Sequence, residues 1–363
     1  MQTVYDLDTP TLLVDLDTLE RNISAMAQIV AAGGKRLRPH TKTHKTPQIA
    51  RMQMEAGASG LTVAKLGEAE VLADAGFDNL LLANQIVGPQ KVARLMDLLR
   101  RVRITVGVDS VEVAGPIGEA ARAQGLRAPV YIEADTGLGR AGARSPEELL
   151  LLARWVSDHP GLELAGLFTY EGHIYRAEDE AGRRKAAAQT AATLRELAAA
   201  LAAQGTPVPE ISVGSTPGAA MMAKEEGITE IRSGVYVFND RMQIKLGVPA
   251  ERCALTVLAT VTSVRPDGRI VVDAGNKSLA SDCPFPDRTY GEIVGHPELT
   301  FVGASEEHGH LQANGPTNLR VGDKVQIIPN HACTCVNMHD TITAYRGEQV
   351  EATWPIAGRG KIR

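Results

Sequence analysis

The sequence has few cysteines, few aromatic residues, no long apolar run and no excess of charge of one sign. Four cysteines in 363 residues are too few for a disulfide framework. Apolar runs such as Leu149 to Ala153 are far shorter than the roughly 20 residues that a membrane helix needs. The 38 basic residues face 43 acidic ones, and aromatic residues make up only 4%. We therefore expect no membrane partner, and a nucleic-acid-binding module is a distant alternative.

The N-terminal stretch from Met1 to Pro10 lacks the basic region and apolar stretch of a secretory signal. We therefore expect a cytoplasmic protein. Its length fits two domains, or one large barrel with an addition.

Short apolar runs alternate with helical patterns over the first two thirds of the chain. Helices are predicted from Asp17 to Gly33, after Thr46-Pro47, after Gly67 and from Ser145-Pro146, on the basis of capping residues and apolar spacing. The predicted strands are Leu37–Thr41, Leu61–Ala64, Asn79–Ala83, Ile104–Asp109, Val130–Asp135, Leu164–Tyr170, Glu210–Gly214 and Glu230–Phe238. Eight buried strands between helices predict an α/β fold, a (β/α)8 TIM-type barrel, with a doubly wound sheet as the main alternative.

The pattern changes after Asn239, where helical periodicity gives way to β-branched segments such as Thr256–Val264. We predict a barrel domain over residues 1–240 and a mostly-β C-terminal domain over residues 241–363. Whether residues 1–10 pack on the β domain is left open.

The segment Lys35 to Lys45 carries seven Lys, Arg or His residues in eleven positions. An exposed basic patch is the simplest interpretation. Lys42, however, falls at the C-terminal end of the first predicted strand, where barrel enzymes place their chemistry. A lysine among other cations is a candidate for Schiff-base formation.

Small polar residues follow the seventh predicted strand as Gly214-Ser215-Thr216-Pro217-Gly218. A turn is the commoner meaning of such a segment. At this position it also offers backbone N–H groups and hydroxyls to a phosphate at the start of a short helix.

The segment from Pro329 to Asn337 contains His331, Cys333 and Cys335. If it forms a strand, His331 and Cys333 point to one face and converge as an imidazole and a thiolate ligand of a zinc-like ion. Cys335 joins that face if the strand stays regular. Such a pair is common and by itself mostly without meaning, and waters or substrate would have to complete the metal shell.

Taken together, these motifs resemble the pyridoxal-phosphate enzymes of the alanine-racemase fold, and more narrowly the D-threonine aldolase and D-serine dehydratase family. The resemblance rests on Arg38-Pro39-His40-Thr41-Lys42-Thr43-His44-Lys45, Asp135 to Gly142, Gly214 to Pro217 and His331 to Asn337. It covers nearly the whole chain. It implies a barrel, a β domain, a homodimer and pyridoxal 5'-phosphate bound to Lys42 as the internal aldimine.

The resemblance also implies roles for further residues. Arg140, Tyr170 and His173 match positions beside the cofactor ring, and His173 is the candidate second base; without the resemblance, a surface arginine and a structural histidine would be the expectation. The full set of implied cofactor contacts is Lys42, Arg140, Tyr170, Gly214, Ser215, Thr216, Arg232, Gly234 and Val235. His331 and Cys333 resemble the zinc site of the dehydratase type, whereas aldolase members more often carry His-x-Asp and use Mn²⁺ or Mg²⁺.

The resemblance thus implies a lyase for D-β-hydroxy-α-amino acids, a small-molecule substrate class. Cys333 favours zinc and with it a dehydratase of the D-serine or D-threo-3-hydroxyaspartate type, which yields a 2-oxo acid and ammonia. The alternative is a D-threonine aldolase, which releases glycine and an aldehyde. An amino-acid racemase and a non-catalytic pyridoxal-phosphate carrier are further alternatives, although such carriers lack a second domain. The sequence leaves the roles of Cys253, Cys283, His308 and Cys335 undecided.

Overall fold

The computed structural model describes residues 2–283 and 289–363, and the chain divides into two compact units. The barrel unit comprises Ala25–Lys42, Ile49–Gly234 and Lys361–Arg363. The β-rich unit comprises Met1–Ser24, Thr43–Gln48 and Val235–Gly360. Each unit is therefore built from segments that are far apart in the sequence.

The barrel unit contains eight parallel strands, in the order β2-β9-β8-β7-β6-β5-β4-β3. These are β2 (Arg36–Leu37), β3 (Leu61–Val63), β4 (Asn79–Leu82), β5 (Arg103–Val108), β6 (Ala128–Glu133), β7 (Leu162–Phe168), β8 (Glu210–Val213) and β9 (Glu230–Ile231). A parallel bridge between His40 and Thr62 joins the two ends of this order and closes it. Each overlaps a predicted strand, although β2 shares only Leu37 with the predicted Leu37–Thr41 and β9 ends seven residues before the predicted Phe238. The predicted (β/α)8 barrel is confirmed.

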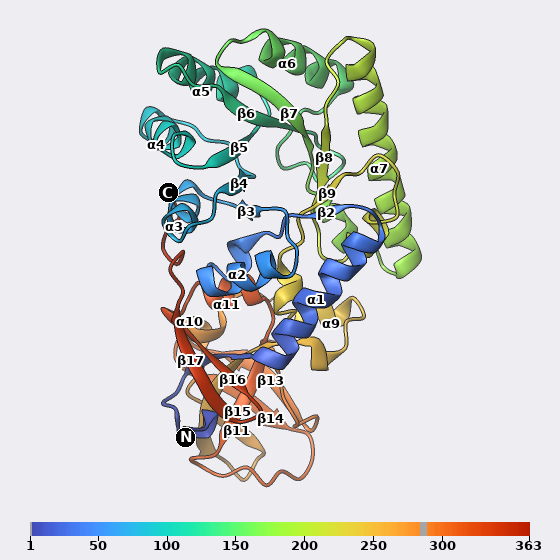
Figure 1. Cartoon of the computed structure of the whole chain (residues 1–363). Helices are drawn as coiled ribbons and strands as arrows, with labels where there is room; N and C mark the ends of the chain where they lie inside the picture. The colour runs from blue at the N-terminus through green and yellow to red at the C-terminus, as the bar shows by residue number, and fades with distance from the viewer. Residues whose placement is uncertain (1, 284–288) are drawn as a thin grey trace. The chain divides into compact units, whose positions relative to one another are not determined.

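Helices cover the outside of these strands, and α4, α5, α6 and α7 follow one another around them (Figure 1). The helices are α1 (Leu16–Ala32), α2 (Pro47–Glu55), α3 (Leu66–Asp74), α4 (Pro89–Leu99), α5 (Val111–Ala123), α6 (Pro146–Asp158), α7 (Glu180–Ala203) and α8 (Ala219–Met222). Helix α6 begins where it was predicted to begin. The Ser145 hydroxyl caps it by accepting a hydrogen bond from the Glu148 N–H group. Pro47 likewise opens α2 as predicted.

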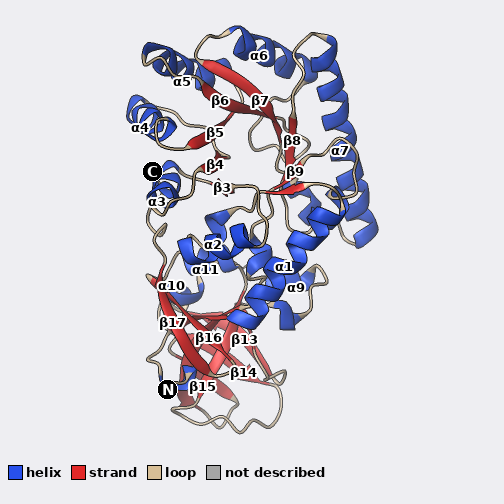
Figure 2. Ribbon diagram, in the orientation of Figure 1, coloured by secondary structure: helices blue, strands red, loops and turns tan. Residues whose placement is uncertain are grey.

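The β-rich unit holds a nine-stranded sheet with only short helices (Figure 2). Its strands are β1 (Thr11–Asp15), β10 (Leu255–Val264), β11 (Arg269–Val272), β12 (Gly291–Ile293), β13 (Leu299–Ala304), β14 (Gly309–Ala313), β15 (Lys324–Pro329), β16 (Thr341–Arg346) and β17 (Gln349–Pro355). Its short helices are α9 (Arg241–Lys245), α10 (Asn276–Leu279) and α11 (Ala332–Val336). The predicted mostly-β C-terminal part is thereby confirmed.

Strand β1 lies in the interior of that sheet. It pairs with β10 in antiparallel and with β16 in parallel orientation. Leu13 of β1 is fully buried in a cluster with Val4, Leu258 and Tyr345. The N-terminal segment therefore supplies part of the core of the β-rich unit.

Within residues 2–283 and 289–363, no helix combines the length and the apolar character that a membrane span requires.

Candidate functional site

A cavity of about 260 Å³ lies at the C-terminal ends of the barrel strands. Its lining residues end a strand or lie in the loop after one: His40 lies in the loop after β2, Ala64 follows β3, Glu133 ends β6 and Gly214 follows β8. The complete lining is His40, Lys42, Ala64, Ala83, Asn84, Gln85, Glu133, Arg140, Phe168, Tyr170, Gly214 and Arg232. The cavity thus occupies the face on which parallel barrels assemble side chains from several loops.

Lys42 reaches this cavity from η2 (Thr41–Thr43), the 3-10 turn that follows β2. Its Nζ atom lies 5.5 Å from the centroid of the Tyr170 ring, and the Arg140 guanidinium lies 5.0 Å from the same centroid. Lys45 belongs to the β-rich unit instead, where its Nζ atom donates a hydrogen bond of 2.9 Å to Asn337 Oδ1. Lys42, Arg140 and Tyr170 are therefore brought together as the sequence predicts.

The loop that carries Arg140 is ordered by Asp135. One oxygen, Oδ1, accepts hydrogen bonds from the N–H groups of Gly137, Leu138 and Gly139. Burial raises the pKa of Asp135, but these three donors outweigh it and hold the pKa below its usual value. Gly142, which closes the loop, has φ of +106°, and a Cβ atom there would meet Asp135 N at 2.7 Å.

Glu133 faces the cavity from the end of β6. Its Oε2 atom accepts a hydrogen bond of 2.6 Å from Gln85, and its Oε1 atom lies 3.5 Å from the Arg140 guanidinium. This buried carboxylate was not predicted from the sequence. An acidic residue at the end of an otherwise apolar strand was the signal available for it.

Arg232 is a fully buried cation at the end of β9. Its guanidinium donates to Ser212 Oγ at 2.7 Å and to the Thr169 carbonyl at 2.7 Å. Ser212 in turn donates to the buried carboxylate of Glu230, which also accepts from Arg38. Burial lowers the pKa of Arg232. Its Nε–H group has no partner among the described residues, so a donor is held in the cavity wall without an acceptor.

The loop after β8 leads into the short helix α8, as predicted, but its first N–H groups are already used. The Glu171 carboxylate accepts from Gly214 N at 3.0 Å and from Ser215 N at 2.7 Å, while the Ser215 hydroxyl accepts from Gly218 N. Thr216 Oγ1, in contrast, is buried without a partner in the described part of the chain. The Thr216 hydroxyl is therefore one donor that this loop leaves available, although Gly214 is the residue of the loop that lines the cavity.

Gly234 and Val235, two further predicted cofactor contacts, follow β9. Ser233 donates to the Ser215 carbonyl at 2.8 Å and so holds the segment before Gly234 beside the loop after β8. Gly234 is the last residue of this stretch of the barrel unit, and Val235 opens η4 (Val235–Val237) in the β-rich unit.

His173 lies in η3 (Gly172–Arg176), outside the set of residues that line the cavity. Its Nε2 atom is 3.5 Å from Thr190 Oγ1, and its buried Nδ1 atom has no partner among the described residues. The ring borders the loop of Arg140 near Gly137. The structure thus places His173 behind the Arg140 loop, and a role as a base stays a prediction.

His331 and Cys333 come together in the β-rich unit. Burial lowers the pKa of His331, but a hydrogen bond with Cys333 and the nearby carboxylates of Asp240 and Asp282 raise it to about 10. Cys333 also donates to Thr43 Oγ1 at 3.3 Å. An imidazole and a thiol in contact form a donor pair that suits zinc once both have lost their protons.

The pair converges for a different reason from the predicted one. β15 ends at Pro329, His331 is the extended N-cap residue of α11, and Cys333 lies in the first turn of that helix. The expectation of a regular strand is therefore wrong, and Cys335 is turned into the core, where its thiol donates to the Ser278 carbonyl at 3.2 Å. In the described ranges no group of three His, Cys, Asp or Glu residues is arranged around a common metal position.

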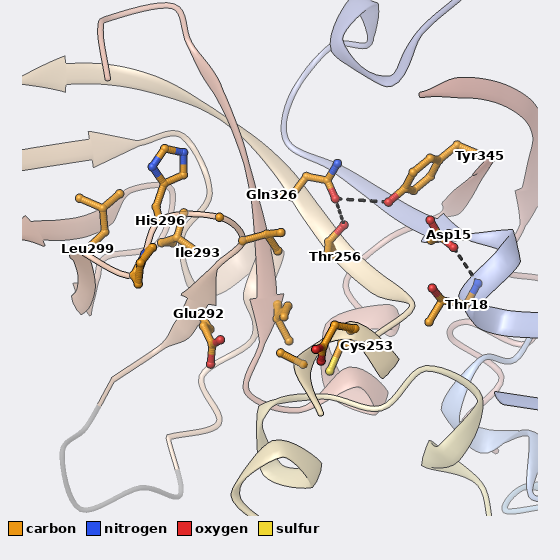
Figure 3. Close-up of a pocket in the computed structure, with 16 residues that line it drawn as sticks. Asp15, Thr18, Cys253, Thr256, Glu292, Ile293, His296, Leu299, Gln326 and Tyr345 are labelled. Atoms are coloured by element: carbon orange, nitrogen blue, oxygen red, sulfur yellow. Dashed lines mark hydrogen bonds between the residues drawn. The ribbon is translucent and has the colours of Figure 1, made fainter. Parts of the chain in front are cut away.

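The β-rich unit also contains a cavity of about 550 Å³ (Figure 3). Gln326 lies between Thr256 and Tyr345 in its wall and accepts a hydrogen bond from each hydroxyl. Burial raises the pKa of Cys253, which also lines this cavity, to about 12, and nearby carboxylates add to the shift. A thiol with such a pKa stays protonated and is not a nucleophile at neutral pH.

A closed parallel barrel with a lysine-lined cavity at its strand ends, followed by a β-rich unit, defines the alanine-racemase class of fold. Sequence comparison agrees, because residues 14–242 match the alanine racemase N-terminal domain and residues 254–345 match the putative serine dehydratase domain. The chain belongs to the family that combines these two domains, which confirms the predicted resemblance.

Curated relatives and solved structures match the chain over nearly its whole length. D-threo-3-hydroxyaspartate dehydratase from Delftia sp. strain HT23 is 37% identical, with 97% of this chain and 98% of the relative covered. D-threonine aldolase from Arthrobacter sp. is 34% identical, with 98% and 94% covered. The crystal structure of D-threonine aldolase from Filomicrobium marinum superposes with a TM-score of 0.94 at 32% identity and covers 100% of both chains.

One similar protein is described by whether it holds a metal. A D-threo-3-hydroxyaspartate dehydratase in which a cysteine is replaced by alanine has been solved in a metal-free form. Its structure superposes with a TM-score of 0.91 at 35% identity and covers 98% of this chain and 99% of that one.

Proposed function

We propose that this protein is a pyridoxal-phosphate- and metal-dependent lyase of D-β-hydroxy-α-amino acids, and a dehydratase rather than an aldolase. Its full-length similarity to dehydratases and aldolases that act on such substrates supports the lyase class. The observation that carries the choice of dehydratase is the contact between His331 and the thiol Cys333, where a carboxylate would suit a harder metal.

The barrel cavity fits pyridoxal phosphate in the chemistry of its donors. Lys42 supplies an amine at the cavity, and Arg232 supplies a buried Nε–H donor without a partner. Thr216 supplies a buried hydroxyl in the loop after β8, beside N–H groups that Glu171 already holds in place. These are the groups that an aldehyde, a ring heteroatom and a phosphate need.

When bound, the cofactor supplies an electron sink for the substrate's Cα–H bond cleavage. Lys42 would hold the cofactor, and its Nζ amine is the group that would accept the substrate's Cα proton. Thr216 would hold the phosphate end, and Arg232 would donate to the ring. Arg140 and Tyr170 form the wall beside Lys42, with the Tyr170 ring next to both cationic side chains.

His331 and Cys333 are the proposed metal ligands, and zinc is the proposed metal because a thiolate favours it over Mg²⁺ or Mn²⁺. The metal would supply Lewis acidity toward the β-hydroxyl group, which makes that group a better leaving group. The products of dehydration are a 2-oxo acid and ammonia.

An assay of the purified protein with D-serine and D-threonine, with and without chelator and added zinc, tests this function. We expect zinc-dependent pyruvate from D-serine and 2-oxobutyrate from D-threonine. Glycine with acetaldehyde from D-threonine would instead identify an aldolase and overturn the choice based on Cys333. Conversion of D-alanine to L-alanine in the presence of chelator would contradict the metal-dependent lyase altogether.

We also propose a cytoplasmic homodimer, as the family resemblance implies. Light scattering coupled to size-exclusion chromatography tests the assembly, and a monomeric mass would reject it.

A further inference from the structure

His331 has a carboxylate partner on one of its two ring nitrogens. Its Nδ1 atom lies 2.6 Å from Oδ2 of Asp282, a residue 49 positions earlier in the chain. An imidazole that donates through Nδ1 keeps its lone pair on Nε2. The contact with Asp282 therefore selects the nitrogen that His331 can offer to a metal.

Asp282 is itself held by the segment it supports. The same Oδ2 atom accepts a hydrogen bond of 3.0 Å from the Thr334 hydroxyl, and the Asp282 carbonyl accepts one of 2.8 Å from Asn330 Nδ2. Contacts on both sides of His331 thus fix the carboxylate relative to the ring. The two side chains are 32% and 38% exposed, so it is these added contacts from Thr334 and Asn330 that distinguish the pair from an isolated surface ion pair.

A second carboxylate fixes the main chain at the same place. Asp240 is buried, and its Oδ2 atom accepts from Ala332 N at 2.9 Å while Oδ1 accepts from Gln243 N at 3.1 Å. Asp240 therefore sets the backbone between His331 and Cys333, and Asp282 sets the ring. The two carboxylates act on different parts of the same pair of ligands.

We propose that Asp282 is a positioning residue for the metal site, which orients the His331 ring and makes it a stronger donor through Nε2. The inference rests on the proposed metal site at His331 and Cys333. Carboxylates that accept from a ligating histidine typically contribute about 10–100-fold to metal affinity. Asp282 was not singled out by the sequence, because nothing in its local pattern points to a residue 49 positions away.

Zinc affinity of the full chain, measured by competition with a chromophoric chelator, tests the inference without any assay of activity. We expect Asp282→Ala to weaken zinc binding by about 10–100-fold. Asp282→Asn keeps an acceptor oxygen without the charge, so its loss should be smaller. Glu298→Gln is the matched control, because Glu298 pairs with His296 Nδ1 at 3.0 Å elsewhere in the same unit, and it should leave the affinity unchanged.

The absorption spectrum of the cobalt-substituted protein provides a second measurement. It would not change if the role of Asp282 were merely structural. The thiolate-to-cobalt charge-transfer band should persist in Asp282→Ala, since Cys333 still binds, while the ligand-field bands shift. Cys333→Ser should abolish the charge-transfer band. An unchanged zinc affinity and an unchanged cobalt spectrum in Asp282→Ala would overturn the role of Asp282.

The inference and the proposed metal site fail in distinguishable ways. If His331→Ala weakens zinc binding and Asp282→Ala does not, the metal site stands and the positioning role is rejected. If His331→Ala binds zinc as tightly as the unmodified protein, the metal site itself is rejected, and the inference with it.

Discussion

The carboxylate of Glu171 accepts a hydrogen bond of 2.7 Å from the backbone N–H group of Ser215, and its other oxygen accepts one of 3.0 Å from Gly214. The bond to Ser215 is buried and the bond to Gly214 is part-buried. A carboxylate acceptor therefore shapes the loop after β8, while the buried Thr216 hydroxyl in the same loop has no partner among the described residues.

Replacing Glu171 with Ala should weaken the binding of pyridoxal phosphate and lower stability. The buried Ser215 N–H group and the part-buried Gly214 N–H group lose their acceptor, and a buried N–H group without an acceptor costs about 1–3 kcal/mol. Equilibrium dialysis with the cofactor and denaturant unfolding measure the two effects. Glu171→Gln keeps one acceptor oxygen, so its cofactor affinity and stability should lie between those of the unmodified protein and those of Glu171→Ala. Unchanged cofactor affinity in Glu171→Ala would show that this loop does not hold the cofactor.

Lys42→Ala should abolish covalent attachment of the cofactor, whereas Lys45→Ala should retain it. Lys42 lines the barrel cavity, while the Lys45 amine is bound to Asn337 in the β-rich unit. Borohydride reduction followed by peptide mapping identifies the modified lysine. Attachment to Lys45 in the unmodified protein would contradict the assignment.

Replacing Cys333 with Asp should lower zinc affinity by about tenfold and improve relative binding of Mn²⁺ and Mg²⁺, because a carboxylate is a harder ligand than a thiolate. Competition titrations with the three metals measure this change. Cys335→Ala serves as the control, since that thiol is buried against Ser278, and should leave metal preference unaltered. Equal zinc affinity in the Asp variant would remove Cys333 from the ligand set.

Cys253 should resist alkylation in the folded protein. Burial raises its pKa to about 12, so at pH 8 only ~10⁻⁴ of the thiol is ionised. The alkylation rate of Cys253 should rise about tenfold per pH unit up to that pKa, because the thiolate is the reacting form. Iodoacetamide labelling followed by mass spectrometry measures this rate, with the denatured protein as the reference. Labelling at the rate of a free cysteine would show an unshifted pKa.

The sequence predicted the barrel well because most of its strands lie on apolar runs, as in Leu80 to Leu82. The two shortest strands, β2 and β9, each pair a charged residue with an apolar one, and their bounds were the least well predicted. Strand β1 was not predicted, although Thr11 to Asp15 contains a similar apolar run. Its partners lie some 240 and 330 residues further along the chain. Pairing at that distance leaves no local signature.

The candidate site was predictable where chemistry follows from position along a strand, as for Lys42 after β2. It was not predictable where a side chain acts through a distant partner. Glu171 meets Ser215 44 positions later, and Asp282 meets His331 49 positions later. His331 and Cys333 were found as a pair, but the geometry that joins them is a helix start and not a strand.

The central place of β1 in its sheet also bears on how the chain is made. β1 leaves the ribosome first among the strands, yet β10 and β16, which flank it, are synthesised later, the second of them some 330 residues behind. At 5–20 residues per second this is a delay of roughly 20–60 s. The barrel strands are completed during that time. Leu12, Leu13 and Val14 meanwhile form an apolar segment without its strand partners, and such segments recruit chaperones or aggregate. The sheet of the β-rich unit can therefore be completed only after β16 has been synthesised, around a strand made some 330 residues earlier.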